Sequence, residues 1–295
     1  MTPESWFEGG ERVRVELGGD AFEIFCRISG SGPWLTLLHG FPTSSWDWAK
    51  VAPALEQRFR LLCFDFLGFG DSDKPRRHRY SIAEQADLTE ALWRHFGVEE
   101  TVLVGHDYGA TVVQELLARE RTAARISSLV LLNAAVYVRL ARPLLIQRLL
   151  ASRVTGPLAA RAVSERVFRK SLASVTSPQH PLGEQELHQH WQVLQRRGGS
   201  AQLSHRLSHY MTDRKQQATR WEAALESERV PKRFIWGMAD PRSGAHVAQE
   251  IRHRLPAAPL VALDDVGHYP HLEVPEVVAQ EIMRGCRSAH RSSWT

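Results

Sequence analysis

Residues 104–110 read Val-Gly-His-Asp-Tyr-Gly-Ala and place one carboxylate, Asp107, between two glycines. This small-x-nucleophile-x-small spacing is typical of a sharp strand-to-helix turn that exposes its central side chain above a sheet. A carboxylate is already ionised at neutral pH, because its ordinary pKa is about 3.9. Asp107 could therefore attack an sp3 carbon directly and become an alkyl ester. Such chemistry opens epoxide carbon–oxygen bonds or carbon–halogen bonds rather than carboxylic esters.

Two further polar residues complete a set that could hydrolyse such an ester. Asp240 lies in the string Trp-Gly-Met-Ala-Asp-Pro and His268 in the string Val-Gly-His-Tyr-Pro, and each follows a predicted strand. Ligands of parallel sheets bind beyond the carboxyl ends of the strands, so these side chains should meet Asp107 there. We expect Asp240 to orient His268, and His268 to take a proton from water as the general base. Asp264 and Asp265 are alternatives to Asp240, but they lie very near His268 in the sequence.

The residues His-Gly-Phe-Pro at 39–42 follow another predicted strand. The glycine allows a tight turn, which would direct the backbone N–H of Phe41 toward the nucleophile. The N–H of Tyr108, directly after the nucleophile, should point to the same place. Together these two groups would form an oxyanion hole, in which each donor is typically worth about 2.7–4 kcal/mol.

The elements that must position these residues alternate along the chain. Short apolar or alternating runs predict strands at 12–17, 21–28, 34–38, 60–65, 101–105, 126–133, 232–237 and 259–263. Apolar residues at three- and four-residue spacing predict helices at 45–57, 81–96, 109–120 and 275–287. This alternation favours an α/β fold with a mostly parallel eight-stranded sheet that helices flank on both faces.

Residues 139–225 differ in character from the rest of the chain. They lack strand-like runs, show helical periodicity, and carry 14 Lys and Arg residues against 5 Asp and Glu residues. We interpret this segment as a helical lid inserted after the sixth strand of a core formed by residues 1–138 and 226–295. Its positive charge is typical of a solvated outer face, and the alternative is attraction to anionic surfaces or substrates.

The composition limits the function classes. The chain has 295 residues, 43% of them apolar and 24% charged, with a net charge of +4, which gives no reason to expect a nucleic-acid partner. Three widely spaced cysteines favour neither a disulfide framework nor a zinc site. We find no signal peptide or membrane-span pattern, so we expect a cytoplasmic protein. We also expect no metal and no cofactor, and the oligomeric state stays open.

At these motifs the chain resembles the α/β-hydrolase superfamily, in the epoxide hydrolase-like and haloalkane dehalogenase-like branch that has an Asp nucleophile. More specific strings at 39–48, 65–75, 80–85 and 106–109 are similar to the mesoderm-specific transcript (MEST)-like hydrolases. The resemblance implies the α/β-hydrolase fold with a helical lid after strand 6. It implies a hydrolase with the catalytic order nucleophile, acid, histidine. It implies little about the substrate.

The resemblance also bears on the leaving group. Haloalkane dehalogenases hold the halide with a Trp after the nucleophile and commonly an Asn after the His-Gly, where this chain has Tyr108 and Phe41. Epoxide hydrolases carry Phe at the second place and polarise the epoxide oxygen with two lid tyrosines. Tyr210 resembles the second of these tyrosines and would be the lid proton donor. The first has no evident match, and Tyr137, His205 and His209 are possible donors.

The sequence therefore favours cofactor-independent hydrolysis of an epoxide to a diol through a covalent ester. The alternatives are carbon–halogen hydrolysis by the same route, and a non-catalytic hydrolase-fold protein that binds a small ligand or a partner. We expect a small apolar organic substrate. Candidate pocket residues are His39, Trp46, Tyr137, Trp191 and His209, although core packing would equally explain the tryptophans.

Overall fold

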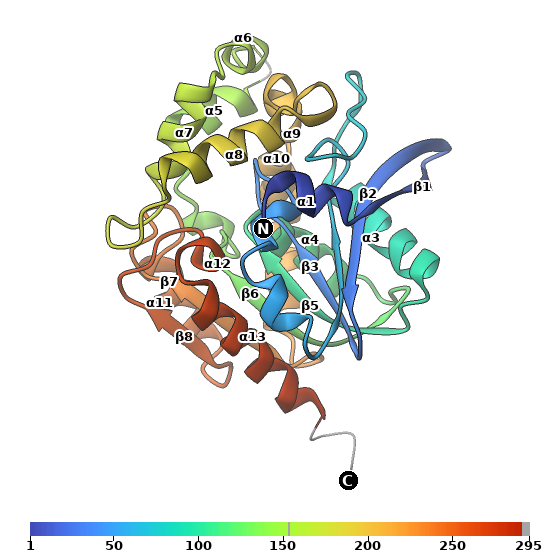
Figure 1. The fold of residues 1–295 in the computed structure, drawn as a ribbon. Coiled ribbons are helices and arrows are strands. Elements are labelled where there is room, and N and C mark those ends of the chain that lie inside the picture. The colour runs from blue at the N-terminus through green and yellow to red at the C-terminus, as the bar shows by residue number, and fades with distance from the viewer. Residues whose placement is uncertain (153, 291–295) are drawn as a thin grey trace.

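The computed structural model describes residues 1–152 and 154–290, with the side chains of 287–290 left undescribed. One eight-stranded sheet runs through the molecule in the order β1-β2-β4-β3-β5-β6-β7-β8 (Figure 1). Its strands are β1 (Glu11–Leu17), β2 (Asp20–Gly30), β3 (Trp34–Leu38), β4 (Arg60–Phe64), β5 (Glu100–His106), β6 (Arg125–Leu132), β7 (Lys232–Gly237) and β8 (Leu260–Leu263). The pairs β1–β2 and β2–β4 are antiparallel and all other pairs are parallel. The predicted mostly parallel sheet is thus confirmed.

Helices cover both faces of the sheet. Those of the core are α1 (Pro3–Glu8), η1 (Ser45–Trp48), α2 (Ala52–Leu55), α3 (Ile82–Phe96), α4 (Tyr108–Leu117), α11 (Ala245–Arg254), α12 (Pro270–Glu273) and α13 (Pro275–His290). One apolar cluster joins α3, α4 and α11 to the sheet, and a second joins α1, η1, α2 and α13 to it. The two clusters are the two halves of a core divided by the strands, as expected for a sheet buried on both faces.

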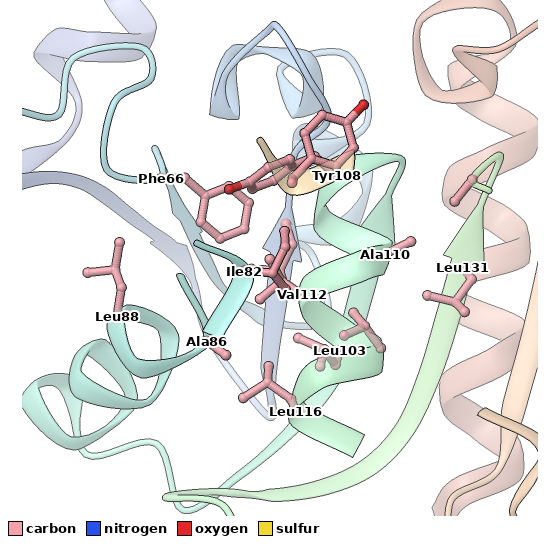
Figure 2. Packing of buried hydrophobic residues seen from close by; sticks show 14 of the residues in the cluster. Phe66, Ile82, Ala86, Leu88, Leu103, Tyr108, Ala110, Val112, Leu116 and Leu131 are labelled. Atoms are coloured by element: carbon pink, nitrogen blue, oxygen red, sulfur yellow. The ribbon is translucent and has the colours of Figure 1, made fainter. Parts of the chain in front are cut away.

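The cluster under α3 and α4 fixes the helix that follows the proposed nucleophile. Figure 2 shows Ile82 of α3, Val112 and Leu116 of α4, and Leu103 of β5 gathered in it. These side chains are fully buried or nearly so. Because α4 is held against β5 along its apolar side, the turn between them has little freedom to move.

One predicted helix is wrong. Residues 45–57 form two short pieces, η1 and α2, in place of a single helix. Pro53 is the reason, since it has no N–H to donate to the carbonyl four residues earlier and is tolerated only near a helix start. It stands in the first turn of α2 accordingly.

The segment between β6 and β7 is entirely helical or irregular in its described part, and we call it the helical insertion. Its elements are η2 (Val138–Leu140), α5 (Leu145–Ala151), α6 (Gly156–Arg161), α7 (Glu165–Ala173), α8 (Glu184–Leu194), η3 (Arg196–Gly198), η4 (Ala201–Leu203), α9 (Ser204–Leu207) and α10 (Tyr210–Glu226). Figure 1 shows α5–α9 gathered at one end of the molecule. A small apolar cluster that includes Phe168, Leu172, Tyr269 and Leu272 ties the insertion to the core. Among the described residues, no helix has the length and apolarity needed to cross a membrane.

Candidate active site

Asp107 occupies a sharp turn between β5 and α4. Its φ of 43° lies in a region that side chains other than glycine rarely adopt, as is usual for a strained functional turn. The flanking glycines leave the room that this turn requires. A Cβ atom on Gly109 would lie 2.3 Å from the carbonyl oxygen of Leu38, and one on Gly105 would lie 3.0 Å from the backbone nitrogen of Ala110. Both glycines are therefore needed for the close approach of the chain.

The carboxylate of Asp107 is buried and held from two sides. The backbone N–H of Phe41 donates to Oδ2 across 3.3 Å, and Nη2 of Arg214 in α10 lies 3.5 Å from Oδ1. Arg214 also donates to the carbonyl oxygen of Asp107 and, through Nε, to Thr111. Burial raises the pKa of Asp107, but the charges of Arg214, His268 and Arg242 outweigh it and leave the pKa below its usual value. Asp107 is therefore an ionised nucleophile candidate with a fixed orientation.

The structure brings His268 and Asp240 together. Nδ1 of His268 lies 2.7 Å from Oδ2 of Asp240, and both side chains are almost fully buried. Burial raises the pKa of Asp240, but His268 and several hydrogen bonds lower it further, so the group is ionised. Nε2 of His268 is buried and has no hydrogen-bond partner among the described residues. This leaves one nitrogen of the imidazole available for a proton of water or substrate.

Asp240 is itself held by three donors at the ends of β6 and β7. Asn133 donates to Oδ2 across 3.0 Å and Ser243 across 2.6 Å, while the backbone N–H of Arg242 donates to Oδ1 across 2.8 Å. Asn133 also exchanges two hydrogen bonds with the backbone of Gly237. The amide side chain thus joins the two strand ends and fixes the acid that orients the imidazole. Neither Asp264 nor Asp265 takes this place.

The loop that carries His268 is anchored at two points. Nε2 of His106 lies 2.8 Å from the carbonyl oxygen of His268. The backbone N–H of His268 donates to the carbonyl oxygen of Val175, in the helical insertion, across 2.8 Å. Glu273 strengthens this junction, because its Oε2 accepts from the backbone N–H groups of Ser177 and Gly267. The general base candidate is therefore held jointly by the core and the insertion.

A cavity of about 510 Å³ opens onto the nucleophile candidate. Its lining includes Asp107, His268 and Tyr210, so three of the four side chains predicted to be catalytic share it. The fourth, Asp240, lies behind the imidazole. The lining comes from the core and from the insertion together, which places the cavity where a reaction at Asp107 would occur.

Tyr210 begins α10 and has 1% of its surface exposed. Its ring packs against Phe41 and Tyr108, and the guanidinium of Arg214 lies 4.6 Å from the ring centroid. Burial, with the charge of Asp107 second, raises the pKa of Tyr210, and a hydrogen bond with Arg242 acts in the opposite direction. The phenol consequently keeps its proton at neutral pH and can donate it.

The two residues predicted to supply oxyanion donors differ in what they contact. The N–H of Phe41 already donates to the nucleophile candidate. Tyr108 is the first residue of α4, so its N–H is one of the helix-start donors that lack a partner within the helix. The side chain of Tyr108 is not part of the cavity lining, and its ring packs against Phe66 and Phe69.

The five predicted pocket residues do not belong to the lining of this cavity. Both ring nitrogens of His39 are hydrogen-bonded to the backbone: Nδ1 to the carbonyl oxygen of Gly40 and Nε2 to the N–H of Phe66. Trp46 packs edge-on against Trp6 in the core, and Trp191 packs against Phe168 within the insertion. These side chains fill apolar space between elements, which is the ordinary role of large aromatics.

The other two predicted pocket residues also lie outside this lining. Tyr137 is buried beside the guanidinium of Arg254, away from Asp107. His209 is the N-cap of α10, directly before Tyr210, and it is not part of the cavity lining. The structure therefore does not bring these five side chains to the cavity at Asp107, and their role in binding stays a prediction. The alternative donor His205 is likewise outside the lining and bonds the carbonyl of Gln202.

Sequence reasoning missed several cationic residues of the cavity. Arg214 and Arg242 lie deepest, beside Asp107, while Arg142, Arg148 and Lys215 are exposed at its rim. A signal was present for both deep arginines. Arg214 follows Tyr210 by one helical turn, and Arg242 comes two residues after Asp240. The expected apolar substrate pocket is therefore a strongly positive one.

A second cavity, of about 70 Å³, adjoins the site between the insertion and the oxyanion loop. Its lining is mainly apolar and includes Leu144, Ile146, Leu150, Val163 and Phe168 from the insertion. From the core come Phe41, Pro42 and Tyr269, and Arg242 lines both cavities.

Asp47, His106 and His271 are buried side chains whose donor atoms lie within 4.8 Å of one another, as a metal ion would require. Each has another structural role. Oδ2 of Asp47 accepts from Thr43, His106 holds the loop of His268, and His271 stacks on Trp48. These contacts support the packing behind the catalytic loop.

Comparison with known proteins agrees with this architecture. The family model described as alpha/beta hydrolase fold matches residues 33–275. LipZ of Mycobacterium tuberculosis is 38% identical over 279 residues, covering 93% of this chain and 94% of LipZ. The mesoderm-specific transcript protein of Mus musculus is 42% identical over 258 residues, covering 84% of this chain and 77% of that protein, which confirms the resemblance seen in the motifs.

Solved structures are more distant in sequence but similar in fold. The haloalkane dehalogenase DbeA from Bradyrhizobium elkani has a TM-score of 0.79 at 20% identity, over 96% of this chain and 99% of that chain. The epoxide hydrolase CorEH has a TM-score of 0.74 at 19% identity, over 93% and 98%. Together with the family model and the two relatives, this fold shows that the chain belongs to the α/β-hydrolase family.

Proposed function

We propose that this protein is a hydrolase that uses Asp107 as the nucleophile, forms a covalent alkyl ester, and opens an epoxide to a diol. The observation that carries the proposal is the shared cavity. The ionised carboxylate of Asp107, the unpartnered Nε2 of His268 and the protonated phenol of Tyr210 all line it. In this proposal residues 139–225 are the lid, which supplies the phenol and closes the cavity over the core.

The first step forms the ester. Oδ1 of Asp107 attacks an epoxide carbon, because Oδ2 is held by the N–H of Phe41 and becomes the carbonyl oxygen. The carbon–oxygen bond breaks, and its electron pair stays on the leaving oxygen. Tyr210 gives that oxygen its proton, so the product of this step is an alcohol and the phenol becomes a phenolate.

The second step hydrolyses the ester. Nε2 of His268 takes a proton from water, and the resulting hydroxide attacks the carboxyl carbon of Asp107. Negative charge develops on Oδ2, where the N–H groups of Phe41 and Tyr108 stabilise it. Collapse of the intermediate breaks the bond between the carboxyl carbon and Oδ1, which leaves with the product as its second hydroxyl group and takes the proton from His268. The oxygen of the water replaces Oδ1 in the carboxyl group, which releases its remaining proton and becomes a carboxylate again. Tyr210 then regains its proton from solvent.

Arg214 and Arg242 support this scheme electrostatically. A guanidinium does not release its proton in proteins, so neither arginine can replace Tyr210 as an acid. Both can hydrogen-bond a leaving oxygen and spread its charge. Arg214 also offsets the burial of Asp107, as the lowered pKa of this carboxyl indicates.

Carbon–halogen hydrolysis is the second candidate function. A departing halide needs stabilisation of its negative charge but no proton. The cationic groups beside Asp107 could supply that stabilisation. The same nucleophile and base would serve. A non-catalytic binding protein is less favoured, because a pure binder gains nothing from a charged carboxylate in a buried site.

A His268→Gln variant tests the proposal and separates the candidates. Without the base, the ester should form but not hydrolyse, and intact mass spectrometry should detect it. An epoxide adds its whole mass, whereas a haloalkane adds its alkyl group in place of a proton. Incubation with a mixed panel of both therefore names the reacting bond.

The control is the double variant His268→Gln/Asp107→Ala, which should gain no mass with any compound. If His268→Gln also stays unmodified throughout both panels, and the wild type releases neither diol nor halide, the proposed chemistry is wrong.

A further inference from the structure

We propose that the substrate is an amphipathic anion, whose carboxylate binds Arg242 while its short apolar chain occupies the second cavity. This inference rests on the proposed function for the reaction, but its binding part can be tested without any reaction. It replaces the apolar substrate that the sequence suggested with a charged one.

The charges around the cavity are the first argument. Among the described residues, five cationic side chains line it, and Asp107 is the one carboxylate in that lining. The five are Arg142, Arg148, Arg214, Lys215 and Arg242. A cavity lined with one sign of charge concentrates ligands of the opposite sign and speeds their association. The positive charge predicted for 139–225 is thus partly directed at the site.

Most of these cations have no acidic partner. Arg214 is committed to Asp107 and Thr111. For Arg142, Arg148, Lys215 and Arg242, no carboxylate of the described residues lies within 4.0 Å. Arg139, close by in the sequence, pairs with Glu250. Four cations of the cavity are therefore left without a carboxylate partner among the described residues.

Arg242 is the most informative of the four. Its Nε atom is buried and lacks a hydrogen-bond partner among the described residues. Leaving a charged donor of this kind unsatisfied is costly, so an anionic ligand that accepts from it gains affinity. Its backbone N–H donates to Oδ1 of Asp240, so the main chain of Arg242 is anchored beside the acid that orients His268. A carboxylate bound to its guanidinium would lie in the cavity that Asp107 also lines.

The second cavity gives the ligand its other end. Its apolar lining and volume of about 70 Å³ suit a chain of a few methylene groups. Arg242 lines both cavities, and Phe41, which bonds Asp107, lines the second. A ligand with its headgroup at Arg242 and its tail beside Phe41 would therefore present its first carbons to the nucleophile. The reactive carbon is accordingly expected next to the carboxylate.

The binding test uses unreactive probes, hexanoate and hexanamide, which have the same chain and differ in charge. Isothermal titration calorimetry at low salt should give wild-type protein at least tenfold tighter binding of hexanoate, because a charge-assisted contact replaces a neutral one. Arg242→Gln should remove this difference, and Arg242→Lys should restore part of it. Arg121→Gln, an exposed arginine outside the cavity, is the matched control and should bind as the wild type does.

Equal binding of both probes by the wild type, absence of hexanoate binding, or a preference that survives in Arg242→Gln would each overturn the inference. A loss of preference in Arg121→Gln as well would also overturn it, since the effect would then reflect net charge alone. Urea unfolding of each variant shows whether it is folded before the comparison is made.

The reaction is tested separately, with 2,3-epoxyhexanoate and 2,3-epoxyhexanamide on the His268→Gln variant. Faster ester formation from the carboxylate supports the inference and the proposed function together. Equal rates from both compounds support the chemistry and overturn the anionic substrate. Selective binding of hexanoate without any adduct supports the anion site and counts against the proposed epoxide chemistry.

Discussion

At the scale of single residues, the site depends on how each charge is balanced. Asp107 stays ionised in a buried position because Arg214 and His268 lower its pKa. Tyr210 stays protonated because burial raises its pKa. The same cavity therefore holds a base-like carboxylate and an acid-like phenol at neutral pH, and this division of roles is the chemical content of the proposal.

Replacing Tyr210 with phenylalanine should distinguish the two leaving groups. Loss of a general acid typically lowers a rate by about 10²–10⁴-fold, so ester formation from an epoxide should slow by about that factor. Ester formation from a chloroalkane should change far less, because chloride leaves without a proton. The comparison is made by rapid-quench mass spectrometry on the His268→Gln background.

Tyr137→Phe is the matched control for this experiment. The hydroxyl of Tyr137 is buried without a hydrogen-bond partner among the described residues, outside the cavity, so its removal should leave both rates unchanged. An equal loss for epoxide and chloride in Tyr210→Phe would mean that the phenol shapes the cavity rather than donating a proton.

Asn133 lies outside the cavity lining and acts on the site through its hydrogen bond to Asp240. Asn133→Leu removes one donor to Asp240 and the two bonds that join β6 to β7, so His268 loses part of its orientation. We expect slower ester hydrolysis, by about tenfold or more, with little change in ester formation. Stopped-flow measurement of both steps tests this, and an equal loss in both would point to general damage to the fold.

At the scale of elements, the strand ends and the turn after β5 determine where the candidate catalytic side chains lie. The contact between Asp240 and His268 could be predicted because both follow strands whose carboxyl ends share one edge of the sheet. The position of Arg214 could not, because it depends on how α10 packs beside α4, and sequence periodicity does not set that distance. The positions of Trp46 and Trp191 could not be predicted for the same reason. The residue type alone does not tell whether an aromatic side chain lines a pocket or fills a core.

The turn after β5 should tolerate no added atom. In Gly109→Ala the new Cβ would meet the carbonyl of Leu38 at 2.3 Å, so we expect a loss of about 1–3 kcal/mol in the free energy of unfolding and much slower ester formation. Gly183→Ala is the control, because a Cβ there meets nothing within 4 Å. Urea unfolding gives the free energy of unfolding of each variant. Similar stability of the two variants would mean that the turn has room for a Cβ atom at residue 109.

At the scale of the whole molecule, the fold was largely predictable and the charge of its cavity was not. The order of strands and helices follows from local periodicity, and the helical insertion follows from a change in composition. Which side of an inserted helix faces the core depends on contacts between distant segments. The cationic lining of the cavity is a property of that assembly, visible only once Arg142 and Arg242 lie on the same cavity.

The buried histidines give a whole-molecule prediction about acid. Burial lowers the pKa of His106 and His190 to about 3, and burial also lowers the pKa of His271. In the unfolded chain the pKa of histidine is about 6.5, so unfolding takes up protons below that pH. Stability is therefore complete above about pH 6.5 and falls as the pH drops toward 3, by about 1.4 kcal/mol per pH unit for each such histidine.

Asp47 opposes part of this effect, because burial raises its pKa and its folded form keeps a proton longer. The net slope should therefore be smaller than the buried histidines alone would give. Urea unfolding at pH 7, 6 and 5 measures it, and His190→Gln should reduce it by about one proton. An unchanged slope in His190→Gln would mean that His190 is already protonated in the folded state and paired with Asp47, 3.7 Å away.

The bond from the amide of His268 to Val175 limits how molecules can reach Asp107. If the insertion opened as a rigid body, it would break this hydrogen bond or displace the loop of His268. The imidazole would then lose its orientation each time the cavity opened. Ligands must therefore enter and leave the cavity while residues 175–177 keep their contacts with the core. In the proposed reaction, product would then leave and new substrate would enter while the imidazole of His268 keeps its position beside Asp240.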